Sequence, residues 1–265
     1  MKRKVFLMAG LVLLVSACFE YNPNQIILDS DEKDLTVKNL QKIQSQEAPD
    51  DTIRFIFMGD TQRFYDQSED FVNKANSVEG LSFVIHGGDI SDFGLSQEFK
   101  WVNDIMSELY VPYLTVVGNH DLLANGRKVY REMYGASNYS FEYGDYKFIM
   151  INTNSREYDF NGQIPDLNWL QTEIEDNPND LNVIVISHVP PFDGDFDPEL
   201  EHDYADLLAS HPKVVLSLHA HTHSFLDREY YNDGVRYFVT TAMLHRGFSL
   251  IKLWTNGLDI QQMEF

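Results

Sequence analysis

The feature that most constrains this chain is a series of short apolar runs, each followed within a few residues by Gly, Asp, Asn or His. The runs lie at 53–58, 81–85, 111–117, 146–151, 183–186, 214–218, 237–240 and 249–254. Runs of this length, rich in Val, Ile and Phe and bounded by turn residues, are typical of buried strands. The sequence therefore predicts a core built from buried strands that end in polar loops.

Stretches with helical spacing separate several of these runs. Ser96 is a candidate N-cap, after which apolar residues recur at helical spacing over 99–109. Further helices are predicted at 66–78, 166–175 and 199–208. Strands and helices alternate in the first half and strands lie closer together later, so we expect one α/β domain over residues 53–265, with a parallel half that continues into a mixed sheet.

Polar residues gather where the first three runs end. Asp60 follows the first run, Asp89 lies 29 residues after it, and Asn119 lies 30 residues after Asp89. Each interval is about the length of one β-α-β unit, so the three loops are predicted to emerge at one carboxyl edge of a sheet, where α/β folds bind ligands. Later runs end near His188 and in the segment His-Ala-His-Thr-His at 219–223.

These side chains are suited to metal ions. Carboxylate, amide and imidazole donors that converge on one edge favour divalent Mn, Fe or Zn, and there are enough donors for two ions. The chain has 20 Lys and Arg against 41 Asp and Glu, a formal net charge of −21. Such a balance disfavours nucleic-acid duplexes as partners, and two divalent ions would explain how so acidic a chain binds a phosphate.

In these motifs the sequence resembles the calcineurin-like metallophosphoesterase superfamily. The matching segments are Asp-Thr-Gln at 60–62, Gly-Asp at 88–89, Gly-Asn-His-Asp at 118–121, the lone His188, and Ala-His-Thr-His at 220–223. The resemblance implies an α/β fold of the four-layer α-β-β-α sandwich type and a centre of two divalent metal ions. It implies that Asp60, Gln62 and His223 hold one ion, that Asn119, His188 and His221 hold the other, and that Asp89 bridges them. His120 then corresponds to the catalytic histidine and Asp121 to the carboxylate that orients it.

The sequence departs from the family pattern at Gln62 and, by a small change from glycine, at Ala220, and from the pattern of one branch at Asp92. Gln62 stands where a histidine is usual, and an amide oxygen is a weaker, neutral ligand than imidazole. Asp92 stands three residues after Asp89, where the purple acid phosphatase branch has a metal-binding tyrosine, so a ferric-tyrosinate centre is not expected.

The chemistry of such a site predicts an enzyme that hydrolyses a phosphomonoester or a phosphodiester of small size. A hydroxide that bridges the two ions would attack phosphorus, and His120 would stabilise the developing charge or protonate the leaving oxygen. Two alternatives stay open: a pyrophosphatase that cleaves a nucleotide-linked compound, and a non-catalytic envelope lipoprotein that keeps the metal site only as structure. No protein partner is evident from the sequence.

Substrate-binding residues are less clearly marked. Arg63 follows the first motif and Arg246 follows a late strand, and either could bind a phosphate. The segment 190–197 follows His188 and carries alternating carboxylates, which could bind a cation or form a solvated loop over the site.

The N-terminus reads as an export signal. Lys2, Arg3 and Lys4 precede an apolar run at 5–15, and Ser-Ala-Cys at 16–18 resembles a bacterial lipobox. We expect residues 1–17 to be a lipoprotein signal peptide and Cys18, the sole cysteine, to be acylated as a membrane anchor in the cell envelope. The acidic segment 18–52 is predicted to be a tether with one short helix near 35–43.

Overall fold

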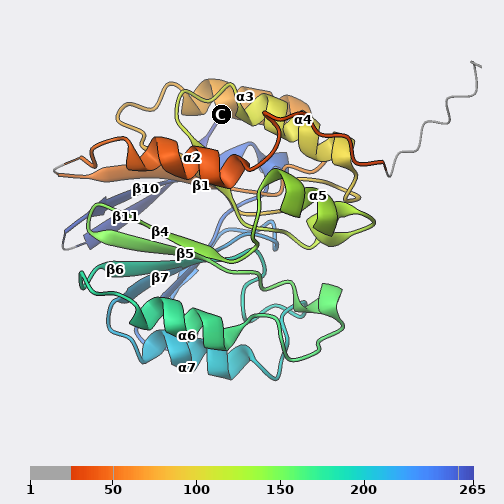
Figure 1. Ribbon diagram of the computed structural model, residues 1–265. Coiled ribbons are helices and arrows are strands. Elements are labelled where there is room, and N and C mark those ends of the chain that lie inside the picture. Colours follow the sequence, from red (N-terminus) through yellow and green to blue (C-terminus); the bar gives the residue numbers. More distant parts are fainter. Residues whose placement is uncertain (1–24, 50, 256) are drawn as a thin grey trace, which may run out of the picture.

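The fold consists of two mixed β-sheets that pack face to face, with helices on both outer sides (Figure 1). The computed structural model describes residues 25–49, 51–255 and 257–265. The first sheet has the order β11 (Gly257–Glu264), β10 (Gly247–Trp254), β1 (Ile53–Met58), β2 (Phe83–His86) and β3 (Tyr113–Thr115). The second has the order β4 (Tyr139–Tyr143), β5 (Tyr146–Met150), β6 (Asn182–Ile186), β7 (Val214–His219), β9 (Arg236–Val239) and β8 (Leu226–Arg228).

The central strands are mostly apolar because both of their faces are buried. In β1, Phe55 and Phe57 point into the core between the sheets, and Ile56 and Met58 point to the helices on the other side. The inner core is aromatic: the ring of Phe83 lies 5.3 Å from that of Phe55 in one sheet. It lies 5.5 Å from that of Phe148 in the other, so aromatic contacts join the two sheets.

Two groups of helices complete the layers. On the first sheet lie α3 (Tyr65–Ala75), α4 (Ser96–Met106) and α5 (Gly126–Met133), and on the second lie α6 (Leu167–Glu175) and α7 (Glu201–Ala209). This arrangement confirms the predicted α-β-β-α sandwich. Strands β1, β2 and β3 are parallel neighbours, so their carboxyl ends meet at one edge, as the motif spacing predicts.

Helix α2 (Leu35–Gln44) corrects the predicted domain boundary. The short helix expected near 35–43 is present, but Leu35 and Ile43 are buried in the cores of the domain. Asn39 donates a hydrogen bond of 2.8 Å from Nδ2 to the carbonyl oxygen of Tyr113 in the edge strand β3. The prediction of a tether up to residue 52 is therefore wrong for this helix, which covers a sheet edge that would otherwise be open.

The other predicted elements are found with small shifts of their ends. The structure also contains α5, β4, β8 and β11, which the sequence analysis missed because their apolar residues are few or interrupted. In β11, for example, every described residue is at least partly exposed.

The export signal and the lipidated Cys18 fall outside the described residues, so both stay predictions. Within the part that is described, none of the helices has the length and apolar character to cross a bilayer.

If α2 is an integral part of the fold, its buried face must contribute to stability. We predict that Ile43→Ala lowers the free energy of unfolding by about 2–5 kcal/mol, since it leaves a cavity in the inner core. Val37 is 55% exposed on the same helix, and Val37→Ala is the matched control, with an expected change within about 0.5 kcal/mol. Chemical denaturation of both variants measures this, and equal stabilities would show that the helix is only a tether.

Candidate metal centre

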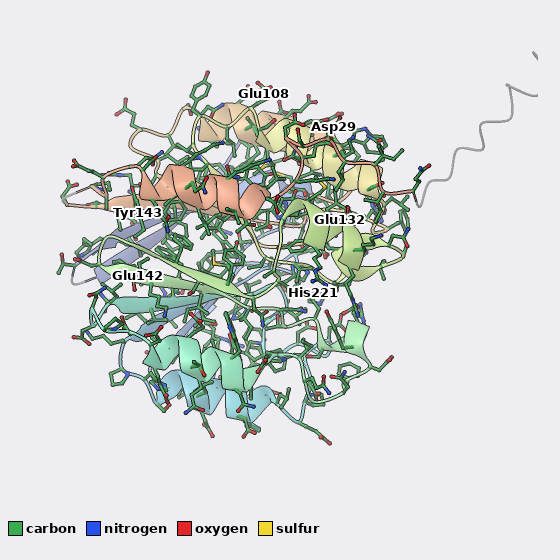
Figure 2. All side chains as sticks on the ribbon, in the orientation of Figure 1. Asp29, Glu108, Glu132, Glu142, Tyr143 and His221 are labelled. Atoms are coloured by element: carbon green, nitrogen blue, oxygen red, sulfur yellow. The ribbon has the colours of Figure 1, made fainter. Side chains whose placement is uncertain are left out.

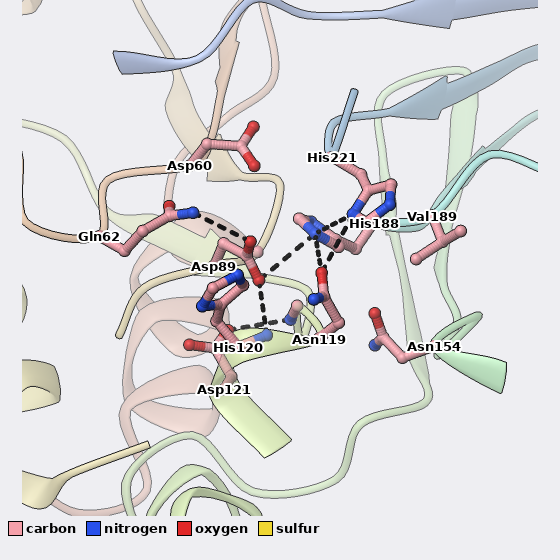
Figure 3. Close-up of polar contacts among 12 residues, drawn as sticks. Asp60, Gln62, Asp89, Asn119, His120, Asp121, Asn154, His188, Val189 and His221 are labelled. Atoms are coloured by element: carbon pink, nitrogen blue, oxygen red, sulfur yellow. Dashed lines mark hydrogen bonds and ion pairs between the residues drawn. The ribbon is translucent and has the colours of Figure 1, made fainter. Parts of the chain in front are cut away.

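The loops after β1 and β2 are joined by backbone hydrogen bonds directly at the predicted ligands. The amide of Asp60 donates to Gly88 O at 3.0 Å, and the amide of Thr61 donates to Asp89 O at 3.1 Å. Figure 3 shows the result: Asp60 and Gln62 lie on one side of Asp89, and Asn119 and the two histidines lie on the other. Figure 2 shows His221 well away from Tyr143, which ends β4 at the left of the view.

The loops approach so closely that side chains would not fit at two glycines. A Cβ atom at Gly118 would collide with the backbone amide and the carboxylate of Asp89. A Cβ atom at Gly88, which has φ +96°, would lie 2.7 Å from Nδ1 of His188. Glycine is therefore required for space at both positions, and at Gly88 also for the backbone conformation.

Several predicted ligands have left-handed backbone conformations. The φ angles are 55° at Asp60, 58° at Asp89, 70° at His221 and 57° at His223. Non-glycine residues in this region cost about 1–3 kcal/mol each, and such strain is characteristic of functional sites. Backbone hydrogen bonds between the loops, such as that from Asp60 to Gly88, hold the chain in these conformations.

One group of donors comprises Asn119, His188 and His221. Oδ1 of Asn119 lies 3.1 Å from Nε2 of His188 and 3.0 Å from Nδ1 of His221. The two imidazole nitrogens are 3.3 Å apart, so three potential ligand atoms converge on one point. His188 donates from Nδ1 to Gly87 O at 2.7 Å, which directs its Nε2 to this point.

A second group comprises Asp60, Gln62 and His223. The carboxylate of Asp60 is fully buried, and within the described part of the chain neither of its oxygens accepts a hydrogen bond. The same holds for Oε1 of Gln62, while Nε2 of His223 lies 3.3 Å from Oδ1 of Asp60. Buried polar atoms without partners are costly, and a cation would satisfy them, so these residues fit a metal ion.

Asp89 lies between the two groups. Its Oδ1 is 3.3 Å from Nε2 of His188, and its Oδ2 accepts a hydrogen bond from Gln62 at 3.2 Å. Burial alone would raise the pKa of Asp89, but the charge of His188 outweighs it and lowers this pKa to about 2. Burial likewise lowers the pKa of His188, yet Asp89 raises it to about 10. Asp89 is thus ionised at physiological pH, as a metal ligand must be, whereas His188 would have to release its second proton to bind an ion through Nε2.

The predicted role of Asp121 is wrong. His120 lies at the site with its side chain about one-third exposed, but its Nδ1 donates to the backbone carbonyl of Asp92 at 2.8 Å. The carboxylate of Asp92 is 3.6 Å from the same nitrogen and pairs with Arg63 at 2.5 Å. Asp92 therefore orients the histidine, a role that the sequence analysis missed because the main contact is made by its backbone.

Asp121 instead joins two loops. Its Oδ1 accepts hydrogen bonds from the backbone and hydroxyl of Ser91 at 2.8 and 3.0 Å, and its Oδ2 accepts one from the amide of Gly118 at 2.9 Å. Burial, followed by the charge of Asp89, raises the pKa of Asp121 to about 7. Its side chain fixes the loops that carry Asp89 and Asn119.

The two arginines predicted to bind substrate both have other partners. Arg63 is paired with Asp92, although its side chain is 59% exposed at the site. Arg246 pairs with Asp70 of α3 at 2.5 Å and donates to Phe265 O at 3.0 Å, so it ties the C-terminal strand to a helix. The structure brings Arg63 to Asp92, which also contacts His120, and gives Arg246 a structural contact.

His86 and His219 support the ligand loops. His86 accepts from Gly88 N at 3.2 Å through Nδ1 and bonds to the hydroxyl of Thr61 at 2.8 Å through Nε2. His219 is held between the hydroxyls of Ser187 and Ser217 at 2.9 and 2.8 Å. Burial lowers the pKa of both histidines to about 3, so both are neutral.

The sequence pattern of calcineurin-like phosphoesterases matches residues 53–225, which include every predicted metal ligand. The chain belongs to this family. It is accordingly a hydrolase of phosphate esters, and members of the family use a dimetal centre. The unpartnered oxygens of Asp60 and Gln62 and the converging atoms of Asn119, His188 and His221 fit such a centre.

Two proteins are similar to this chain over most of its length. A 3',5'-cyclic-nucleotide phosphodiesterase of Nostoc sp. is 24% identical over 69% of this chain and 76% of its own length. An uncharacterized protein of Bacillus subtilis, YvnB, is 21% identical over 81% of this chain, which spans 20% of that protein's length.

Solved structures share the fold. A dimetal phosphatase of Danio rerio has a TM-score of 0.67 and 15% identity, covering 81% of this chain and 98% of its own. A purple acid phosphatase of yellow lupin has a TM-score of 0.63 and 14% identity, covering 83% and 52%.

The corrected role of Asp121 is testable. Asp121→Asn replaces one acceptor oxygen by an NH2 group, so a buried N–H of Ser91 or Gly118 loses its partner. We expect the free energy of unfolding of the chelator-treated protein to fall by about 1–3 kcal/mol. His120→Asn, in the same motif, is the control and should change it by less than about 0.5 kcal/mol. Unchanged stability with reduced turnover in Asp121→Asn would instead support the orienting role.

Proposed function

We propose that this protein is a phosphodiesterase that acts on small organic phosphodiesters with the help of two divalent metal ions. The observation that carries the proposal is the convergence of two donor groups on Asp89, with His120 beside them. A site that served only as structure would not need a partly exposed histidine held in place by Asp92.

The ions, when bound, supply a hydroxide nucleophile and the positive charge that an acidic chain otherwise lacks. The rest of the chemistry falls to the chain. His120 is held at its Nδ1, so its Nε2 is free to donate a proton to the leaving oxygen or to stabilise charge on phosphorus. The carboxylate of Asp92 lies 3.6 Å from Nδ1 of the ring, and Arg63 pairs with that carboxylate.

Charge supports a diester over a monoester. A monoester carries about two negative charges at neutral pH and a diester carries one, so the monoester needs more compensation. Arg63 and Arg246, the two predicted phosphate-binding arginines, are already paired with Asp92 and Asp70. The similarity to a cyclic-nucleotide phosphodiesterase points the same way.

His120→Asn tests the proposal with two diesters of different leaving group. On a dialkyl phosphodiester, whose leaving oxygen needs a proton, we expect turnover to fall about 10²–10⁴-fold. On bis(4-nitrophenyl) phosphate the loss should be smaller, because that leaving group departs without a proton. His202→Asn, an exposed histidine of α7, is the control with unchanged turnover.

Wild-type turnover of the dialkyl ester by His120→Asn, or full activity after removal of metal by a chelator, would contradict the proposal. Parallel assays with a phosphomonoester and with a nucleotide-linked pyrophosphate distinguish diester hydrolysis from phosphatase and pyrophosphatase activity. Preferred turnover of either would overturn the diester assignment.

We also propose that the protein is exported and anchored to the cell envelope through Cys18. The support is the basic and apolar leader with a cysteine at the lipobox position. Fractionation of cells that express Cys18→Ser should move the protein from the membrane to the soluble fraction, and an unchanged membrane-bound share would contradict the anchor.

A further inference from the structure

The two ring nitrogens of His221 face different surroundings. Nδ1 faces the donor group, 3.0 Å from Oδ1 of Asn119 and 3.3 Å from Nε2 of His188. Nε2 faces two carboxylates, 3.4 Å from Oδ1 of Asp193 and 3.3 Å from Oδ2 of Asp195. One side of the ring is thus directed to the candidate metal ion and the other to the loop that follows His188.

The two carboxylates belong to an ordered loop. Asp193 accepts the backbone N–H of Asp195 at 3.0 Å and its own amide donates to Pro190 O at 3.0 Å. Asp195 pairs with Arg156 at 2.6 Å, and the backbone amide of Arg156 donates to Asp195 O at 3.1 Å. The side chains of Asp193 and Asp195 are 28% and 17% exposed, so they are partly removed from water.

This arrangement determines which nitrogen of His221 can bind a metal. A neutral imidazole has one N–H and one lone pair. Carboxylates accept hydrogen bonds and cannot donate them when ionised, so they place the proton of His221 on Nε2 and leave the lone pair on Nδ1. His188 shows the same principle with a backbone carbonyl, since its Nδ1 donates to Gly87 O and its Nε2 faces the donor group.

We propose that Asp193 and Asp195 are positioning residues for metal binding: they hold the Nε2–H of His221 and so present its Nδ1 to the ion that it shares with Asn119 and His188. The inference rests on the metal centre of the proposed function. The carboxylates of the 190–197 segment thereby act on His221. This role differs from the two expected from the sequence, a separate cation site and a solvated loop.

The test is metal binding in the absence of substrate. Wild-type protein stripped with a chelator is titrated with Zn²⁺ in competition with a chromophoric chelator, which gives the affinity of each ion. In the double variant Asp193→Ala/Asp195→Ala we expect one ion to bind about 10–100-fold more weakly and the other to bind as in the wild type. Asp193→Asn/Asp195→Asn should lie between the two, because an amide oxygen still accepts the hydrogen bond but carries no charge.

Two controls separate the contact from general effects. Asp203→Ala/Asp206→Ala removes two exposed carboxylates of α7, hence the same charge, and should leave both affinities unchanged. In a His221→Ala background, where one ion is already weakened, removal of Asp193 and Asp195 should have no further effect. A further loss in that background would show that the carboxylates act without His221 and would overturn the inference.

The outcomes also distinguish this inference from the metal centre itself. Two bound ions in wild-type protein, with unchanged affinities in Asp193→Ala/Asp195→Ala, would refute the positioning role alone. A third ion that binds the wild type and is lost in that variant would replace it by a separate cation site. If the wild-type protein binds no Zn²⁺, the metal centre of the proposed function fails as well.

Discussion

The buried carboxylate of Asp89 is the point on which both halves of the molecule converge. It accepts the backbone N–H of His120 at 2.9 Å, faces His188 at 3.3 Å, and accepts from Gln62 at 3.2 Å. These residues follow strands of different sheets, so one charge holds three loops together. Asp89 is only 2% exposed, and a buried carboxylate is unfavourable unless positive charge and hydrogen-bond donors surround it. The three loops supply the donors, and the cations that the loops bind supply the positive charge.

The sandwich accounts for that convergence. Aromatic rings interlock between the sheets and fix the relative position of strands that carry ligands from both. The absence of a side chain at Gly88 and Gly118 then lets the backbone of these loops lie directly against His188 and Asp89. Several ligands have left-handed backbone conformations, which direct their side chains to the site. The strain is concentrated at the site and the stability comes from the core around it, a division that is common in enzymes.

The sequence predicted the parts of this structure that depend on local pattern. The bounds of β1 are the predicted ones because every residue of it except Arg54 is apolar and buried, and the ligands follow from their positions at strand ends. Contacts that depend on tertiary packing were missed. The sequence of helix α2 resembles an acidic linker, and only the contacts of Asn39 and Ile43 with the sheets show that it belongs to the domain. Asp92 accepts a hydrogen bond from His120 through its backbone carbonyl, and a backbone contact does not depend on the residue type and cannot be predicted from it.

The central claim is that Asp89 joins two metal ions, and anomalous X-ray diffraction from crystals grown with Mn²⁺ or Zn²⁺ tests it most directly. The account predicts two anomalous peaks that both contact Asp89. One should also contact Asn119, His188 and His221, and the other should contact Asp60, Gln62 and His223. A single peak, or two peaks of which one lies away from Asp89, would contradict it.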